Sequence, residues 1–87
     1  MATVFIPAQL RELTGSAAQV EIEARNVREV IAALEQRFPG IRDRLCTADE
    51  LSPSLQVSID GVMTTRGLVA KVGPHSEVHF LPALGGG

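Results

Sequence analysis

Aromatic residues are nearly absent from this sequence. It has no tryptophan and no tyrosine, and only three of its 87 residues are phenylalanine. The hydrophobic core is therefore expected to consist mainly of valine, leucine, isoleucine and alanine. Nucleic-acid binding is disfavoured, because few rings are available for base stacking and the eight basic residues are scattered in a chain of net charge −2.

Cysteine is scarce as well. The single Cys46 cannot form an internal disulfide, which is typical of proteins in a reducing compartment, so a cytoplasmic location is expected. With no His or Asp partner evident in the sequence, Cys46 is interpreted as a packing residue. The N-terminus lacks the charged and apolar regions of a signal peptide, and no apolar run approaches the length of a membrane span. Neither secretion nor membrane contact is expected.

Motifs for catalysis and for metal binding are also missing. The sequence shows no glycine-rich phosphate loop after a strand and no zinc-ligand spacing. His75 and His79 would lie about 13 Å apart on one strand, too far to hold one metal ion, and are interpreted as surface residues. Glu21 and Glu23 share one face of a predicted strand, where a solvent-exposed face is favoured over a catalytic pair. The chain is therefore expected to be no enzyme and to bind no cofactor.

The sequence is long enough for one domain and contains residue patterns typical of strands and of a helix. Alternating apolar residues and turn signals predict five strands, over residues 3–7, 18–24, 55–59, 62–63 and 77–81. The first two strands are expected to pair antiparallel around the turn at Gly15. Asp60 and Gly61 predict a tight hairpin between the third and fourth strands.

One helix is predicted between the two hairpins. Asn26 is a favourable N-cap with Glu29 three residues later, and Pro39-Gly40 ends the helix. The apolar residues recur at helical spacing: Val27, Val30, Ile31, Leu34 and Phe38. Residues 41–46 are expected to add a helical turn, residues 47–53 to form a loop, and Leu68 and Val69 to reach the core. The order predicts an α+β fold, a mixed sheet of four to five strands with one main helix packed across it.

The C-terminus is the one low-complexity segment. Residues 1–82 are expected to form the domain and residues 83–87 a flexible tail that ends in Gly85, Gly86 and Gly87. Five residues can extend about 17 Å, and glycine has no Cβ to obstruct a narrow channel. The tail could be a frayed terminus or a cloning scar. It could also carry the carboxylate of Gly87 into a partner's active site.

Both ends of the chain resemble a known family. The terminal segment Phe80-Leu81-Pro82-Ala83-Leu84-Gly85-Gly86-Gly87 is similar to the end of the ubiquitin-like sulfur carrier proteins, the MoaD/ThiS family. These include the small subunit of molybdopterin synthase and the carriers of thiazole and cysteine synthesis. The run Ala8-Gln9-Leu10-Arg11-Glu12-Leu13 resembles the molybdopterin branch, whereas Pro7 and the Leu81-Pro82 pair look more like the cysteine-synthesis branch.

The resemblance implies a β-grasp fold and a reaction cycle performed by partner proteins. A ubiquitin-activating-type enzyme uses ATP to adenylate Gly87, and a sulfur donor of the cysteine desulfurase or rhodanese type converts it to a thiocarboxylate. The tail then delivers sulfide to a synthase for molybdopterin, thiazole, cysteine or another sulfur-containing metabolite. Residues expected to dock on partners are Phe5, Phe80, Leu81, Pro82, Ala83 and Leu84.

Two other functions stay open. The chain could be a protein modifier that Gly87 joins to target lysines, since the same activation chemistry serves both. It could also be a β-grasp binding module with an unused tail.

Overall fold

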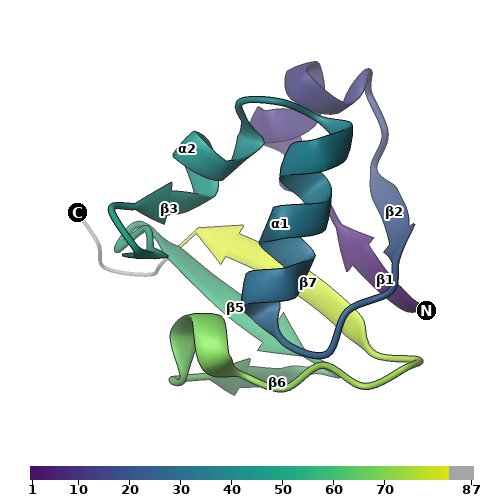
Figure 1. The fold of residues 1–87 in the computed structure, drawn as a ribbon, viewed down its shortest axis with the longest axis vertical. Coiled ribbons are helices and arrows are strands. Elements are labelled where there is room, and N and C mark those ends of the chain that lie inside the picture. Colours follow the sequence, from purple (N-terminus) through teal and green to yellow (C-terminus); the bar gives the residue numbers. More distant parts are fainter. Residues whose placement is uncertain (83–87) are drawn as a thin grey trace.

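The computed structural model describes residues 1–82, and its main feature is a five-stranded sheet with one helix across one face (Figure 1). The strand order is β2-β1-β7-β5-β6. The strands are β1 (Ala2–Phe5), β2 (Gln19–Ile22), β5 (Leu55–Ile59), β6 (Val62–Thr64) and β7 (Glu77–Pro82). The central strands β1 and β7 run parallel, and the other pairs are antiparallel. The predicted mixed sheet is therefore confirmed.

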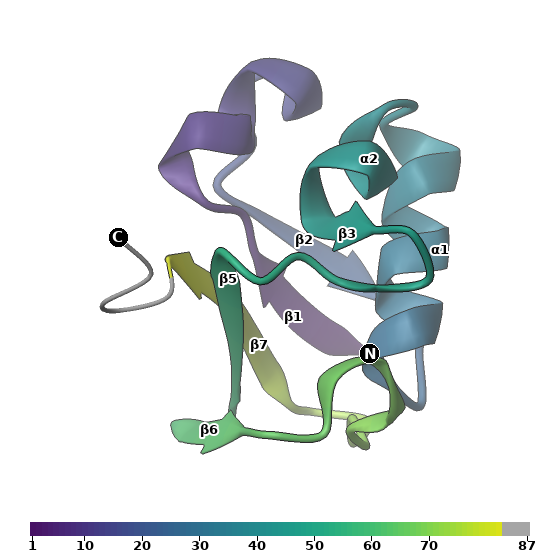
Figure 2. The ribbon, with the colours of Figure 1, turned by 90° about the vertical axis from the view of Figure 1, so that its left-hand side faces the viewer.

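Alternation along the strands separates a covered face from an open face. Val4 in β1 and Ile6 directly after the strand are 0% and 2% exposed, whereas Phe5 between them is half-buried. Figure 2 shows α1 (Val27–Arg37) lying on one side of the sheet, and no α-helix of residues 1–82 lies on the opposite side. The core between the sheet and α1 is built from Val, Leu and Ile, with Phe80 as its one fully buried aromatic residue.

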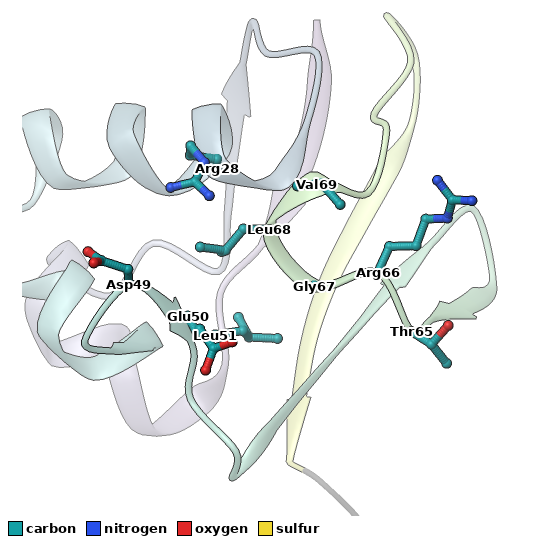
Figure 3. Close-up of a pocket in the computed structure, with 9 residues that line it drawn as sticks. All are labelled: Arg28, Asp49, Glu50, Leu51, Thr65, Arg66, Gly67, Leu68 and Val69. Carbon is teal, nitrogen blue, oxygen red and sulfur yellow. The ribbon is translucent and has the colours of Figure 1, made fainter.

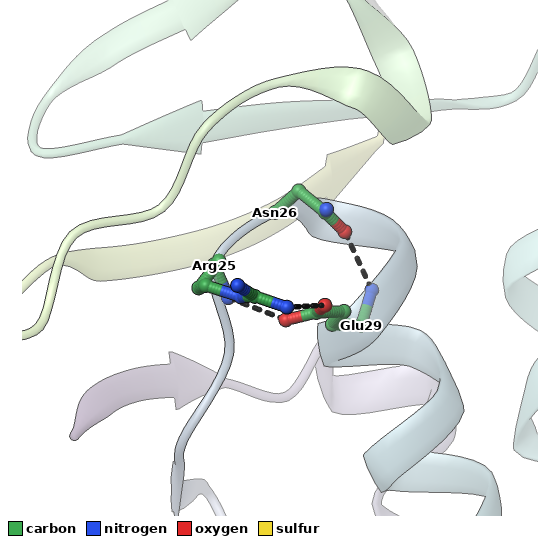
Figure 4. A network of polar contacts seen from close by, with 3 residues as sticks. All are labelled: Arg25, Asn26 and Glu29. Carbon is green, nitrogen blue, oxygen red and sulfur yellow. Dashed lines mark hydrogen bonds and ion pairs between the residues drawn. The ribbon is translucent and has the colours of Figure 1, made fainter.

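Hydrogen bonds fix the start of α1 (Figure 4). The Asn26 side chain accepts a bond from the Glu29 N–H at 2.8 Å, which confirms Asn26 as the N-cap. The Glu29 carboxylate bonds the N–H of Arg25 at 2.8 Å, one residue before the cap, and lies 3.3 Å from the Arg25 guanidinium. The sequence pattern is that of a capping box, but the returning bond is shifted by one residue.

The turn after α1 is closed by another carboxylate. Glu35 accepts hydrogen bonds from the backbone N–H groups of Gly40 and Arg42. Gly40 has a φ of 100°, which favours glycine, and α2 (Ile41–Leu45) starts directly after it as predicted. Ile41 and Leu45 are buried, so this short helix extends the core beyond the end of α1.

Shorter elements complete the chain. The connection after β1 forms the 3₁₀ helix η1 (Ala8–Thr14), which buries Leu10 and ends at Gly15 with a φ of 64°. Residues 47–53, expected as a loop, instead contribute to a small hairpin of β3 (Cys46–Thr47) and β4 (Glu50–Leu51). Its turn includes Ala48 at a φ of 56°.

The region after β6 differs in one respect from the prediction. The 3₁₀ helix η2 (Gly67–Val69) buries Leu68 as expected, but Val69 is 62% exposed and is not part of the core. A single 3₁₀ turn presents only a narrow side to the core, so one of two adjacent residues must face outward.

The Asp60-Gly61 hairpin is confirmed. Both residues have positive φ values, 55° and 83°, as a two-residue turn of this kind requires. The Asp60 carboxylate also bonds the Ser76 hydroxyl and the Glu77 N–H, both at 2.9 Å. The turn is thereby tied to the start of β7.

Candidate functional site: the end of β7 and the open sheet face

The last strand ends at a defined edge of the sheet. β7 lies between β1 and β5, and its final residues Leu81 and Pro82 pair with Gln56 and Leu55 at the start of β5. β1 pairs with residues 77–79 of β7, and β5 pairs with residues 78–82, so the last described residue stands at the end of a paired strand (Figure 1). The predicted site residues Ala83, Leu84, Gly85, Gly86 and Gly87 lie outside the described residues, so their roles stay predictions.

Two rings stack on the open face next to this edge. Phe5 and His79 are partners in the parallel β1–β7 register, and their ring centroids are 4.1 Å apart with planes inclined by 21°. His79 is half-buried, and its Nε2 lies 3.8 Å from the Glu77 carboxylate. His79 is thus part of an apolar surface and not an isolated surface histidine. The sequence could not show this, because the contact depends on a parallel register between the two ends of the chain.

A hollow of about 430 Å³ lies where the open face meets η1. Phe5, Leu81 and Pro82 line it on the sheet side, and Pro7 and Arg11 line it on the side of η1. Arg11 Nε donates to the carbonyl of Ile6 at 3.3 Å, which holds the side chain at the rim. The hollow combines apolar walls with one guanidinium directly beside the point where the tail begins. Arg11 was not among the predicted site residues.

One predicted docking residue is corrected by the structure. Phe80 pairs with Val57 on the covered face, and it is only 3% exposed. Alternation along β7 places Leu81 on the open face and turns Phe80 toward α1. Phe80 therefore belongs to the core, and Phe5, Leu81 and Pro82 remain as the described residues of the predicted docking surface.

The remaining hollows and reactive groups do not form a catalytic constellation in residues 1–82. A hollow of about 420 Å³ lies between α1, the β3–β4 hairpin and η2, and Figure 3 shows the residues that line it. Its polar side chains carry mixed charge, and Arg66 extends away from Asp49 and Glu50. Cys46 is buried, which raises the pKa of its thiol and makes it a weak nucleophile.

Within the described range, no group of three or more His, Cys, Asp or Glu side chains is placed to hold a metal ion. None of the helices there is both long enough and apolar enough to cross a membrane.

The topology and the single covering helix define a β-grasp protein of the ubiquitin-like class. The chain belongs to the ThiS family, whose profile matches residues 4–87. It is thus a ubiquitin-like sulfur carrier of the MoaD/ThiS family. A curated relative, the sulfur carrier protein CysO of Mycobacterium tuberculosis, is 33% identical over 92 residues that cover 98% of this chain and 97% of the relative.

Solved structures agree with this assignment. A chain in the crystal structure of the Amycolatopsis orientalis BexX/CysO complex superposes with a TM-score of 0.90 at 34% identity, with both chains covered completely. Mycobacterium tuberculosis CysO gives 0.87 at 27% identity and covers 97% of this chain and 100% of its own. The small archaeal modifier protein 1 of Methanosarcina acetivorans gives 0.80 at 24% identity, covering 99% and 95% of the two chains, and shows a shared fold alone.

Proposed function

We propose that this sulfur carrier works through the carboxylate of Gly87, which partner enzymes activate, convert to a thiocarboxylate and use as a sulfide donor. The observation that carries the proposal is the position of the last strand. β7 ends at the rim of an apolar open face, and five more residues follow that end in a glycine carboxylate. The family assignment supports the sulfur-carrier role, and the geometry supports delivery by the tail.

The chemistry must come from the partners. The Gly87 carboxylate attacks the α-phosphate of ATP on a ubiquitin-activating-type enzyme, pyrophosphate leaves, and an acyl adenylate forms. A sulfur nucleophile then attacks the carbonyl carbon and AMP leaves. Where the sulfur arrives as a persulfide from a desulfurase or rhodanese, a thiol reductant releases the thiocarboxylate. ATP is thus a substrate of the activating partner, and the carrier itself holds no cofactor.

The hollow beside the end of β7 is proposed to be a docking surface, by which a partner holds the body while the tail reaches inward. The apolar side chains of Phe5, Leu81 and Pro82 offer area to desolvate, and Arg11 at the rim can pair with a carboxylate of the partner. Ordering a five-residue tail costs about 1–2 kcal/mol for each residue, so binding energy from this surface is needed to offset it. Ala83 and Leu84 are proposed to extend the apolar contact.

The final acceptor is proposed to be a biosynthetic synthase for molybdopterin, thiazole, cysteine or another sulfur-containing metabolite, in the cytoplasm. The named relatives are CysO proteins, and one similar chain comes from a complex with BexX. This supports an acceptor that binds the carrier as a separate protein. Each class of acceptor is assayed with the thiocarboxylate form of this chain. The acceptor that consumes the sulfur identifies the pathway.

Mass spectrometry tests the proposal. The purified chain is incubated with a ubiquitin-activating-type enzyme of the same organism, ATP and a sulfur donor. The expected product has one oxygen of Gly87 replaced by sulfur, and a chain lacking Gly87 serves as the matched control. Conjugates of higher mass at lysines of other proteins would instead indicate the modifier function. An unmodified terminus after incubation with several activating enzymes contradicts both.

A further inference from the structure

The two edges of the sheet differ in how they are protected. At one edge, β2 exposes the charged side chain of Glu21, which discourages pairing with another strand. At the other edge, β6 has no partner strand on its outer side within residues 1–82. Val62 and Met63 in β6 are 69% and 47% exposed, and the strand contains neither a charge nor a proline. β6 is therefore the edge open to an added strand.

The backbone of β6 is suited to such pairing. The two-residue turn at Asp60-Gly61 makes Ile59 and Val62 the hydrogen-bonded pair that closes the hairpin. In an antiparallel ladder these pairs alternate with pairs that exchange no bonds, and Ser58 and Met63 form such a pair. The N–H and C=O of Met63 consequently point away from β5, toward the open edge.

The surface beside β6 carries positive charge. A hollow of about 310 Å³ adjoins the strand and includes Val62 and Thr64 in its lining. Arg66 and Lys71 are the only charged residues that line it, and neither takes part in the ion pairs found among residues 1–82. Asp60 is the acidic residue nearest to β6 in the sequence, and its carboxylate accepts hydrogen bonds from the Ser76 hydroxyl and the Glu77 N–H.

We propose that the β6 edge and this hollow bind an extended segment of a partner protein in which apolar side chains alternate with carboxylates. Main-chain bonds to Met63 supply the register. Arg66 and Lys71 select the acidic side chains on the face of Val62 and Thr64, and the alternating apolar side chains lie on the opposite face. A second copy fits poorly, because joining two β6 edges would bring both pairs of cations together. The segment must therefore come from a different, acidic protein.

The position of β6 allows a partner to bind there without covering the end of β7. β6 pairs with residues 57–59 of β5, whereas the end of β7 pairs with Leu55 at the other end of that strand. Figures 1 and 2 show β6 at a distance from the end of β7. A partner on β6 leaves the tail available to an enzyme, so two proteins can be held together. The proposal does not depend on the chemistry of Gly87.

Peptide titration followed by amide NMR tests the proposal on the full chain. The probe is the hexapeptide acetyl-Asp-Val-Asp-Val-Asp-Val-amide, and the matched control has lysine in place of each aspartate. The acidic peptide is expected to shift the amide signals of residues 61–66 and 70–71 and to slow hydrogen exchange at Met63. The lysine peptide is expected to bind about tenfold more weakly, as two exposed ion pairs allow.

Two substitutions separate main-chain pairing from side-chain contact. Met63→Pro removes an N–H that β5 does not use, so the fold is retained while binding is lost; Met63→Ala keeps the N–H and retains binding. Unchanged binding by Met63→Pro, with the remaining amide signals native, would overturn the proposal. It is equally overturned if millimolar acidic peptide shifts only open-face signals or none, or if signals of residues 61–66 move with protein concentration alone.

Discussion

Asn26 and Glu29 determine where α1 begins, because each satisfies a backbone N–H that the helix itself cannot bond. Asn26→Ala leaves the N–H of Glu29 without its partner and is expected to lower the free energy of unfolding by about 1 kcal/mol. Urea denaturation measures the change. Gln36→Ala, at an exposed position of the same helix, is the control and should leave stability nearly unchanged.

Glu35 makes the turn after α1 sensitive to acid. The backbone N–H of Gly40 and then that of Arg42 lower the pKa of the Glu35 carboxyl below its ordinary value of 4.5. A lowered folded-state pKa contributes stability that is present above the ordinary value and is lost as pH falls through the folded value.

The Glu35→Gln variant should therefore have a lower Tm than the parent at neutral pH. Because the variant lacks this carboxylate, its Tm should fall less than that of the parent between pH 7 and about pH 3. Thermal scans at both pH values measure the difference. Glu23→Gln, at an exposed residue without a hydrogen bond to the described part of the chain, is the control. Equal pH dependence in the parent and Glu35→Gln would contradict the assignment.

Phe5 is the described residue on which the docking proposal depends most. Phe5→Ala removes the ring that stacks on His79 and lines the hollow at the chain end. The KM for the carrier in ATP–pyrophosphate exchange by the activating enzyme should rise about tenfold, the size expected for a docking contact, with kcat retained. Thr3→Ala, two residues earlier on the same face, is the control. A fall in kcat with unchanged KM would contradict a docking role.

At the scale of elements, α1 supplies much of the core on the covered face of the sheet. Leu34 is fully buried, and Leu34→Ala is expected to lower the free energy of unfolding by about 2–5 kcal/mol through lost burial and the cavity left behind. Val69→Ala truncates a side chain that is 62% exposed, and it should change the free energy of unfolding by less than about 0.5 kcal/mol. Chemical denaturation compares the two. Similar losses would mean that Val69 packs in solution.

The elements that the sequence predicts well are those with a repeated pattern. The helix from Val27 repeats its apolar residues over three turns, and the strand 55–59 alternates before the strong turn signal Asp60-Gly61. In both cases each residue's local preference agrees with the buried face that the fold requires. The fold class followed from the order of these elements.

The parts that escaped prediction have no such repetition. The hairpin β3–β4 has two residues in each strand, too few to show alternation, and its turn places Ala48 at a positive φ without a glycine or asparagine to indicate it. The contact between Phe5 and His79 on the proposed docking surface also escaped prediction, because the two residues are far apart in the sequence. Phe5 and His79 meet only because β1 and β7 pair in parallel across most of the chain, and a single sequence contains no signal for that register.

At the scale of the whole molecule, the proposed chemistry and the stability of the domain should be separable. Deletion of Gly87 removes the carboxylate that is proposed to carry sulfur, so sulfur transfer should be abolished. Because Phe80 is the last buried residue of the described core, the Tm should stay nearly unchanged. Thermal unfolding and a sulfur-transfer assay on the same preparation test this. A large loss of Tm would show that the terminus is part of the folded structure.

The central place of β7 has a mechanical consequence. In the proposed cycle, an enzyme draws the terminus inward while the open face stays docked, which would load β7 along its axis. The ladder bonds to β1 and β5 lie across this direction and share the load in shear on both flanks, whereas a strand at the edge would peel away one bond at a time. In the proposed cycle, this arrangement lets the body withstand tension, so that the same carrier could be released and loaded again without refolding.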